Sequence, residues 1–321
     1  MPGHDDIPFV FAGAGLDRLA PRRDDPDWLR ETLAAARTRF VPVLGEENTI
    51  VAGSDAPAPL LLDCAAARVL LTQAHCMVLL GSYAGETCFA LGLPPDASLP
   101  AGKIALTNLR PQLAVLESGV LALLGYARAM VHWHRHNRFC GKCGAPTRSH
   151  RAGHELRCTR AECGNVIYPC VNPAIIVLVT HGGHCLLGRQ SGWLERRYST
   201  IAGFVEPGED PEASVRREVR EETNIRVTSM QYDASQPWPY PASLMLGFRA
   251  TADNTDIHCN DGELADARWF SREDIVRGIR DGGLVLPTYR SISYRLVQTW
   301  FEESGKYSLD HYPQTEAFSD R

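Results

Sequence analysis

The stretch EASVRREVREET, residues 212–223, carries carboxylates at a spacing that suits a divalent cation. Asp210 and the proline after it predict the start of a helix that covers residues 211–223. Because helical residues step by about 100°, Glu218, Glu221 and Glu222 share one face. Carboxylates three and four residues apart repel one another, and Mg²⁺ or Mn²⁺ would relieve that repulsion through oxygen ligands. A solvated, salt-bridged surface helix is the other interpretation.

A second group of residues with metal-binding chemistry lies upstream. Four of the ten cysteines are clustered as Cys140-x2-Cys143-x14-Cys158-x4-Cys163, whereas the other six are scattered. Paired cysteines at this spacing predict one structural Zn²⁺ per chain, held by four thiolates. The same region is basic, which is also typical of nucleic-acid-binding zinc ribbons. Its cationic residues are Arg135, Arg138, Lys142, Arg148, Arg151, Arg157 and Arg160.

The elements that must position these groups fall into three zones. Residues 1–128 have their own apolar segments and turns, which predict an N-terminal mixed α/β domain. Residues 137–170 form the predicted zinc ribbon. Residues 171–305 alternate strand and helix patterns, so the fold class is α+β. Strands are expected over 175–179, 185–187, 225–227 and 244–248, and helices over 121–138, after the capping box at Ser271 and near Thr288. The polar residues 306–321 are expected to be a mobile tail, and no internal repeat is found.

Composition excludes some classes of function. The 321 residues are 44% hydrophobic and 22% charged, with a net charge of −5, which is ordinary for a globular protein and unlike a bulk polyanion binder. No apolar run approaches the roughly 20 residues that span a bilayer, so no membrane partner is expected. The acidic N-terminus lacks the pattern of a signal peptide, which predicts a cytoplasmic protein.

The segment from Gly203 to Ile225 resembles the Nudix box, G-x5-E-x7-R-E-U-x-E-E-x-G-U, with Asn224 in place of the last glycine. The resemblance implies a Nudix α/β/α sandwich with a mixed sheet, and a loop–helix–loop that binds Mg²⁺ or Mn²⁺. It implies a metal role for Glu218, Glu221 and Glu222, with Arg217 orienting Glu209. Those five residues are the expected catalytic set, and Glu222 or a neighbour would activate water.

Residues 235–243, SQPWPYPAS, resemble the SQPWPFPxS segment of NADH pyrophosphatases, a Nudix family that also has a zinc ribbon. The resemblance implies that the Ala202 carbonyl and Glu263 join the metal site, and it implies a homodimer. It implies substrate contacts for Phe204, Tyr168, Gln236, Pro237, Trp238, Pro239, Tyr240, Pro241, Ala242, Ser243, Ser293 and Arg110.

Three functions remain open on this basis. The first is metal-dependent hydrolysis of the pyrophosphate of NAD(H) to AMP and nicotinamide mononucleotide. The second is the same chemistry on NAD-capped RNA, which the basic ribbon favours. The third is an inactive Nudix and zinc-ribbon scaffold or regulator, which the retained carboxylates Glu218, Glu221 and Glu222 disfavour.

Overall fold

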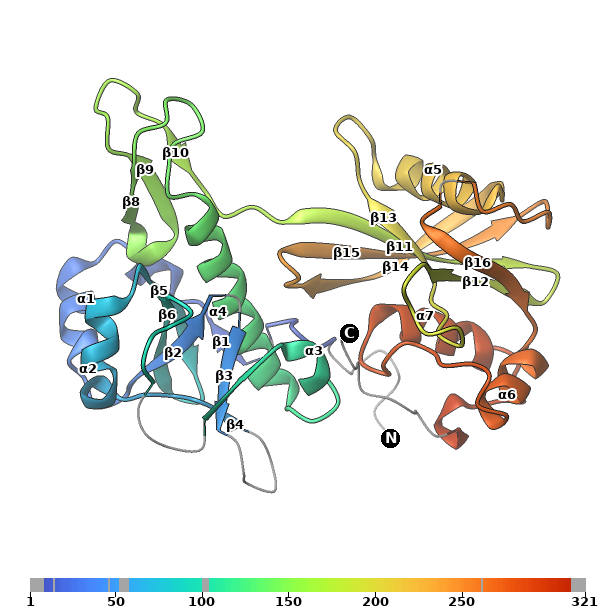
Figure 1. Cartoon of the computed structure of the whole chain (residues 1–321), viewed down its shortest axis with the longest axis horizontal. Coiled ribbons are helices and arrows are strands. Elements are labelled where there is room, and N and C mark those ends of the chain that lie inside the picture. Colours follow the sequence, from blue (N-terminus) through green and yellow to red (C-terminus); the bar gives the residue numbers. More distant parts are fainter. Residues whose placement is uncertain are drawn as a thin grey trace. The chain divides into compact units, whose positions relative to one another are not determined.

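The computed structural model describes residues 9–13, 15–45, 47–51, 58–99, 104–260 and 262–312 (Figure 1). The expectations for the N-terminal octapeptide and for residues 313–321 lie outside these ranges. The chain forms two compact units. One contains the chain up to Val171 together with Trp238–Ala242, and the other contains Asn172–Pro237 and the chain from Ser243 onward.

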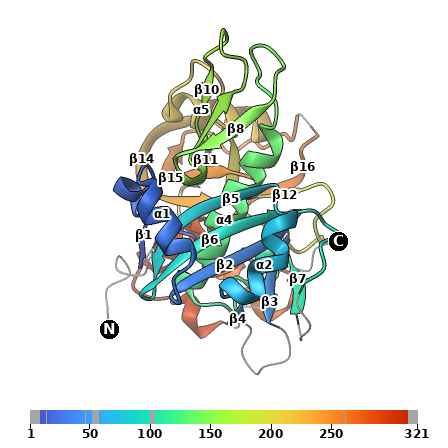
Figure 2. The same ribbon diagram turned by 90° about the vertical axis from the view of Figure 1, so that its left-hand side faces the viewer.

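The first unit is built on a mixed sheet with the order β1-β5-β6-β2-β3-β4, and β7 pairs with β3. Helices α1 and α2 cover one face of this sheet and the long helix α4 covers the other (Figures 1 and 2). Phe40, Leu79 and Phe89 are fully buried in its core. The bounds are β1 Leu16–Asp17, α1 Pro26–Leu33, β2 Thr38–Leu44, β3 Glu47–Val51, β4 Ala58–Pro59, α2 Cys64–Gln73, β5 Cys76–Tyr83, β6 Glu86–Leu93, β7 Ile104–Thr107, α3 Leu109–Gln112 and α4 Ser118–His136.

The zinc ribbon is a small antiparallel sheet within the first unit, with the order β10-β9-β8. Its strands are β8 Thr147–His150, β9 Glu155–Cys158 and β10 Val166–Ile167, with the 3-10 turn η3 at Arg151–Gly153. This turn lies directly on β5: a Cβ on Gly153 would come within 2.8 Å of the Met77 carbonyl oxygen. His154 Nε2 lies 2.7 Å from the Leu79 carbonyl oxygen. The ribbon is therefore fixed to the sheet of its own unit.

The second unit contains a mixed sheet with the order β14-β15-β11-β12-β16, and β13 pairs with β11. Helix α5 packs on β13 and β11, whereas α7 packs on β11 and β15 from the opposite face (Figure 1). The predicted α/β/α sandwich is confirmed. The bounds are β11 Asn172–His181, β12 His184–Gln190, β13 Ile201–Phe204, α5 Pro211–Thr223, β14 Val227–Trp238, β15 Ser243–Ala252, β16 Leu264–Phe270, α6 Arg272–Arg280, α7 Ile292–Glu302 and η4 Leu309–His311.

The two units share one strand connectivity. In the second unit β11 is parallel to β15, antiparallel to β12, and flanked by β13, after which α5 begins. In the first unit β2 is parallel to β6 and antiparallel to β3, and Leu62 bridges to Phe40 of β2 just before α2 begins. The expectation that the chain has no internal repeat is therefore wrong. The repeat is one of strand connectivity.

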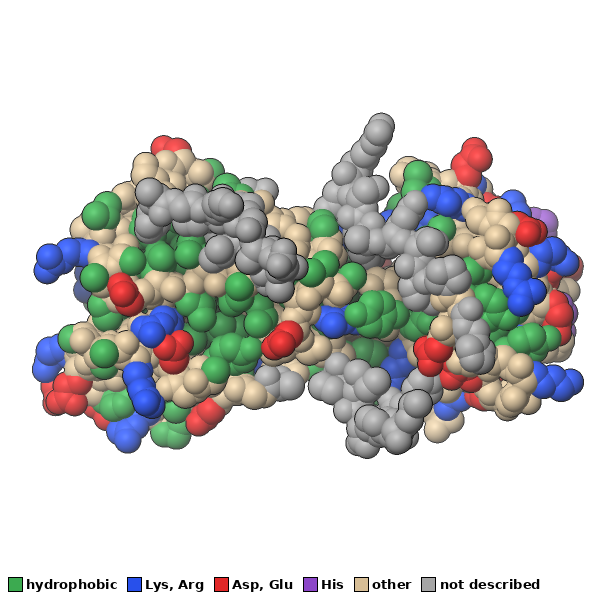
Figure 3. Space-filling view, turned by 90° about the horizontal axis from the view of Figure 1, so that it is seen from below, with side chains coloured by type: hydrophobic (Ala, Val, Ile, Leu, Met, Phe, Trp, Pro, Cys, Tyr) green, Lys and Arg blue, Asp and Glu red, His purple; other side chains and the backbone are tan. Residues whose placement is uncertain are grey.

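Of the predicted tail, residues 306–321, the described part reaches residue 312 and includes η4, which contacts α7 and buries Leu309. Of the helices in the described ranges, none combines the length and apolar character that a bilayer crossing requires. Seen from below, hydrophobic side chains gather on one face of the first unit, with charged groups around them (Figure 3).

Candidate active site

Helix α5 begins and ends where the sequence predicts. The Asp210 side chain accepts a hydrogen bond from the Ala213 N–H at 2.7 Å, which caps the helix N-terminus. At the other end Asn224 has a φ of 62°, in the left-handed region, and its N–H donates to the Arg220 carbonyl. Asparagine tolerates this conformation, so its replacement of glycine in the box leaves the helix end intact.

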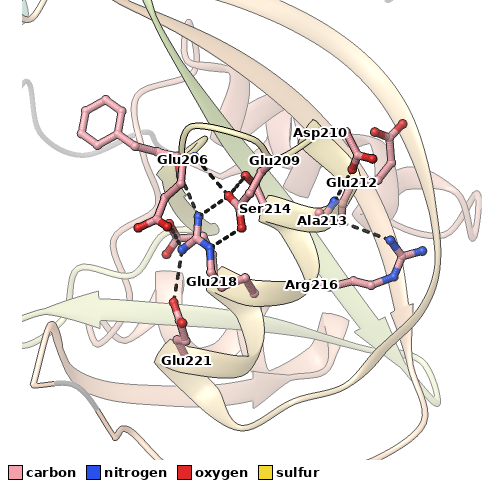
Figure 4. Close-up of polar contacts among 11 residues, drawn as sticks. Glu206, Glu209, Asp210, Glu212, Ala213, Ser214, Arg216, Glu218 and Glu221 are labelled. Atoms are coloured by element: carbon pink, nitrogen blue, oxygen red, sulfur yellow. Dashed lines mark hydrogen bonds and ion pairs between the residues drawn. The ribbon is translucent and has the colours of Figure 1, made fainter.

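Arg217 holds the acidic groups of this site around one guanidinium. Its Nε and Nη2 donate to the two oxygens of Glu209 at 2.7 and 2.8 Å. Its Nη1 lies 2.8 Å from Glu218 Oε1 and 3.1 Å from Glu221 Oε2. Figure 4 shows Glu209, Glu218 and Glu221 on the same side of α5, while Arg216 extends away from them. The arrangement joins the loop before α5 to the carboxylate face of the helix.

Glu209 is anchored in its ionised form. Hydrogen bonds from Arg217, from the Ser214 hydroxyl and from the Glu206 N–H lower the pKa of its carboxyl to about 2. Both of its oxygens are used in these bonds, so Arg217 fixes the position of the Glu209 carboxylate and of the loop that carries it. This geometry matches the role that the Nudix resemblance gives to the pair.

Glu218 is in the opposite electrostatic situation. Burial raises its pKa, the bonds from Arg217 oppose that shift, and the negative charges of Glu221 and Glu263 add to it. Glu263 is therefore close enough to act on Glu218, although it belongs to the segment before β16. A carboxylate that is penalised by burial and by like charges is one that a bound cation would stabilise.

Gly203 makes room for the Glu218 carboxylate. It lies in β13, opposite Ile175 of the central strand β11. A Cβ at this position would lie 1.9 Å from the carboxyl carbon of Glu218 and 2.0 Å from its Oε1. The close packing of strand and carboxylate thus requires glycine.

The donor chemistry of this face fits a hard divalent cation such as Mg²⁺ or Mn²⁺. The Glu221 side chain is 55% exposed and Glu222 only 3%, so the helix carboxylates run from solvent into the protein. Within the described ranges, the only group of three or more His, Cys, Asp or Glu side chains placed to hold a metal ion is the cysteine cluster, whose ligand atoms all lie within 4.8 Å of one another. Glu218 and Glu221 are both paired with the same Arg217 nitrogen, Nη1.

The four predicted zinc ligands come together. Cys140 Sγ lies 3.8 Å from Cys163 Sγ, and Cys143 Sγ lies 3.4 Å from Cys158 Sγ. Thiolates at about 2.3 Å from a tetrahedral Zn²⁺ are about 3.8 Å apart, so these distances fit the ion. The Asn165 side-chain amide and the Arg160 N–H donate to Cys140 and Cys158. The x4 spacing of the second pair is compatible with the cluster.

The predicted substrate segment is divided between the two units. Gln236 is fully buried: its amide donates to the Arg290 carbonyl and accepts from the Ile292 N–H. It therefore positions the start of α7. Trp238, Pro239, Tyr240, Pro241 and Ala242 belong to the first unit.

Within the first unit, two arginines hold the segment through Tyr240. The Arg110 and Arg128 guanidinium carbons lie 4.7 and 5.2 Å from the centre of its ring. Arg128 Nε also donates to the Pro239 carbonyl at 3.0 Å. The Trp238 ring meets the Phe11 ring edge-on, with centroids 6.0 Å apart. Arg110, for which the sequence signal was weak, therefore contacts the predicted substrate segment through the Tyr240 ring.

The remaining predicted contacts differ in exposure. Phe204 is 56% exposed at the end of β13, and Tyr168 is equally exposed in the first unit. Ser293 is buried, and its hydroxyl lies 2.9 Å from Ser199 Oγ and 2.8 Å from Thr200 Oγ1. Ser243 is buried at the start of β15. Ala202 lies in β13 opposite Ile176.

In each unit, some residues that contact the predicted functional residues were not indicated by the sequence. Ser214, Ser199, Thr200, Phe11 and Arg128 were not expected to contribute. Ser214 lies one turn after Asp210 on the buried side of α5, and that position was the available signal. The others depend on contacts between residues far apart in the chain, which leave no local pattern.

Comparisons with known proteins match all three zones. Family models match residues 171–288 as a NUDIX domain, residues 135–168 as an NADH pyrophosphatase zinc ribbon domain, and residues 37–133 as an NADH pyrophosphatase-like rudimentary NUDIX domain. The last match accounts for the repeated topology. Helix α2 stands where α5 stands in the second unit, and its sequence CAAARVLLTQ contains no carboxylate.

Curated relatives include the NAD-capped RNA hydrolase NudC of Pseudomonas aeruginosa, 40% identical over 220 residues, which are 68% of this chain and 75% of that protein. The NAD-capped RNA hydrolase NUDT12 of Homo sapiens is 38% identical over 226 residues, which are 67% of this chain but 46% of that protein. The chain thus spans about half the length of the human relative. A NUDIX hydrolase structure from Nitrosomonas europaea aligns with a TM-score of 0.41 and 20% identity, covering 53% of this chain and 94% of that one.

Proposed function

Because the chain belongs to the NADH pyrophosphatase family of Nudix hydrolases, we propose that it hydrolyses the pyrophosphate of NAD(H). Water adds to one phosphorus atom and the bridging P–O bond breaks, which yields AMP and nicotinamide mononucleotide. The observation that carries the proposal is the carboxylate face of α5, organised by Arg217 and packed on Gly203. An inactive scaffold would not need a carboxylate face. Helix α2, which takes the place of α5 in the first unit, contains no carboxylate.

The residues proposed to hold Mg²⁺ or Mn²⁺ are Glu218, Glu221, Glu222, Glu263 and the carbonyl of Ala202. Bound there, the ion would neutralise pyrophosphate oxygens and make a bound water more acidic. The supporting observations are the buried position of Glu222 and the raised pKa of Glu218, a group whose charge a cation would stabilise.

The chain's own groups account for orientation and proton transfer. Glu209 and Arg217 fix the loop that carries Phe204, since Arg217 Nη2 donates to the Phe204 carbonyl at 2.9 Å. The exposed Phe204 ring is then available to stack on the nicotinamide. Glu222 is the proposed acceptor of the water proton.

Further substrate contacts and the assembly are also part of the proposal. We propose contacts from Tyr168 and Arg110, from the segment Gln236–Ser243 and from Ser293. We further propose domains at 1–128, 137–170 and 171–305, a homodimer, and a cytoplasmic location. The matched zinc-ribbon range, 135–168, supports the middle boundary pair.

NAD-capped RNA is the second candidate substrate. The relatives in Pseudomonas aeruginosa and Homo sapiens carry the name of that activity. Independently, the zinc ribbon concentrates cationic side chains in a chain whose net charge is −5. Local charge of this kind governs contacts with a polyanion more than net charge does.

A product assay tests the proposal. The protein is incubated with NADH and Mg²⁺ or Mn²⁺, and the products are resolved by mass beside the variant Glu222→Gln. We expect AMP and reduced nicotinamide mononucleotide, with a loss of at least about a hundredfold in the variant. Glu212→Gln is the matched control, because Glu212 is exposed at the other end of α5 (Figure 4). Absence of cleavage by folded, zinc-loaded protein would exclude NADH as the substrate.

A further inference from the structure

The zinc ribbon presents one exposed sheet face whose composition is unusual. Arg148 of β8 is directly opposite Arg157 of β9, and Arg157 is opposite Val166 of β10. Pro146, two residues before Arg148, bridges to Phe139. Because residues opposite one another, or two apart, point to the same side, Phe139, Arg148, Arg157 and Val166 lie on one face. We call these four residues the ribbon face.

The two sides of this sheet differ in exposure at the central strand β9. Leu156 has the opposite orientation to Arg157 and is buried, and the adjoining turn η3 lies on β5. On the ribbon face, by contrast, Phe139 is 62% exposed and Val166 is 38% exposed, and both arginines are exposed. A phenylalanine this exposed next to two guanidinium groups needs an explanation other than core packing.

Electrostatics point to an anionic partner. Like charges directly opposite one another in a sheet are destabilising. Arg157 is partly compensated, because Nε donates to Glu155. Within the described ranges no carboxylate pairs with Arg148, nor with the exposed Lys142 and Arg160 of the two cysteine loops. The region 135–168 has only two carboxylates, Glu155 and Glu162, against seven arginines and lysines.

We propose that the ribbon face binds single-stranded RNA, with a base stacked on Phe139 and phosphates on Arg148 and Arg157. A flat sheet face with an exposed aromatic ring and flanking arginines suits splayed bases and a phosphodiester backbone. An inorganic anion would leave the aromatic ring unused. The inference rests on the second substrate candidate of the proposed function, NAD-capped RNA, for which this face supplies the contact with the RNA body.

Binding is measured by fluorescence anisotropy with an uncapped, labelled 12-nucleotide single-stranded RNA. For Phe139→Ala we expect affinity to fall by about fivefold or more, the usual effect of removing a stacking aromatic. For Arg148→Gln we expect the slope of log affinity against log salt to become shallower by about 0.7, the value for one phosphate on a single strand. Arg157 is left unchanged because its loss would strand the buried Glu155.

Two matched controls separate this face from general charge and hydrophobicity. Arg68→Gln removes an exposed arginine from α2, and Tyr232→Ala removes a 52% exposed aromatic from β14. Both are expected to bind RNA like the wild type. Zinc content and thermal unfolding establish that every variant is folded.

The kinetic readout distinguishes this inference from the proposed function. In the face variants, kcat/KM for NAD-capped RNA falls in step with RNA affinity, while NADH hydrolysis stays unchanged. Wild-type RNA affinity in Phe139→Ala and Arg148→Gln would overturn the inference, as would tighter binding of duplex than of single-stranded RNA. A protein that binds RNA through this face but does not cleave NADH would leave the inference standing and remove the NAD(H) proposal.

Discussion

Replacing Gly203 with alanine tests how the candidate active site is assembled. The added methyl group would lie 1.9 Å from the Glu218 carboxyl carbon and 2.4 Å from its Oε2, well inside any allowed contact. Gly203 is paired to Ile175 in the central part of the sheet, so the strand is held in place. We therefore expect the carboxylate to move and the strand to stay.

The size of the effect follows from that displacement. A clash this close requires Glu218 to shift by more than about 1 Å, and misplacing a catalytic group by about 1 Å costs on the order of a hundredfold in rate. The contact between Glu218 and Arg217 Nη1, 2.8 Å in the native protein, would be lost as well. We expect kcat to fall by about a hundredfold and more metal to be required for half-maximal activity.

The assay is NADH cleavage with Mg²⁺ or Mn²⁺ titrated, combined with thermal unfolding. Gly283→Ala is the control, because the nearest atom to its added Cβ would be 3.9 Å away. A double-mutant cycle with Glu218→Ala isolates the cause: in that background, Gly203→Ala should have little further effect. Wild-type activity in Gly203→Ala, or a full additional loss in the double variant, would refute the packing argument.

Three other perturbations have defined outcomes. Arg217→Lys replaces a two-pronged contact with Glu209 by a single point charge, so kcat/KM for NADH should fall at least about tenfold; an unchanged value would show that the fork is dispensable. Burial lowers the pKa of His154 to about 4, whereas a histidine in the unfolded chain has a pKa of about 6.5. Protonation of His154 therefore favours the unfolded state as the pH falls from the higher of these pKa values to the lower. Over that pH range the free energy of unfolding of the wild type should drop by up to about 3 kcal/mol more than that of His154→Gln. If chemical denaturation gave the same pH dependence of the unfolding free energy for both proteins, this expectation would be wrong. Stripping zinc with a chelator, or Cys143→Ser, should melt the ribbon and lower the thermal midpoint; an unchanged midpoint with one Zn²⁺ per chain lost would show that the site carries no stability.

Local chemistry explains what the sequence by itself determined. The spacing of Glu218, Glu221 and Glu222 and the caps at Asp210 and Asn224 predicted α5, because helix periodicity and capping act within a few residues. The cysteine spacing predicted the zinc cluster for the same reason, since each loop presents two sulfurs to one point. The box and the SQPWPYPAS segment also predicted the family.

Tertiary structure alone decided how these pieces are supported. The first unit repeats the strand connectivity of the second, yet α2 contains no carboxylate, so no second copy of the Nudix box marks the repeat. The sequence predicts that Gln236 contacts substrate, and only the structure shows that both ends of its amide also hold the start of α7. That Gly203 accommodates Glu218, and that Arg110 and Arg128 hold Tyr240, depend on residues brought together from distant positions in the chain. Periodicity records which side of an element is buried, whereas the identity of the neighbour across the interface is fixed only when the sheets and helices pack.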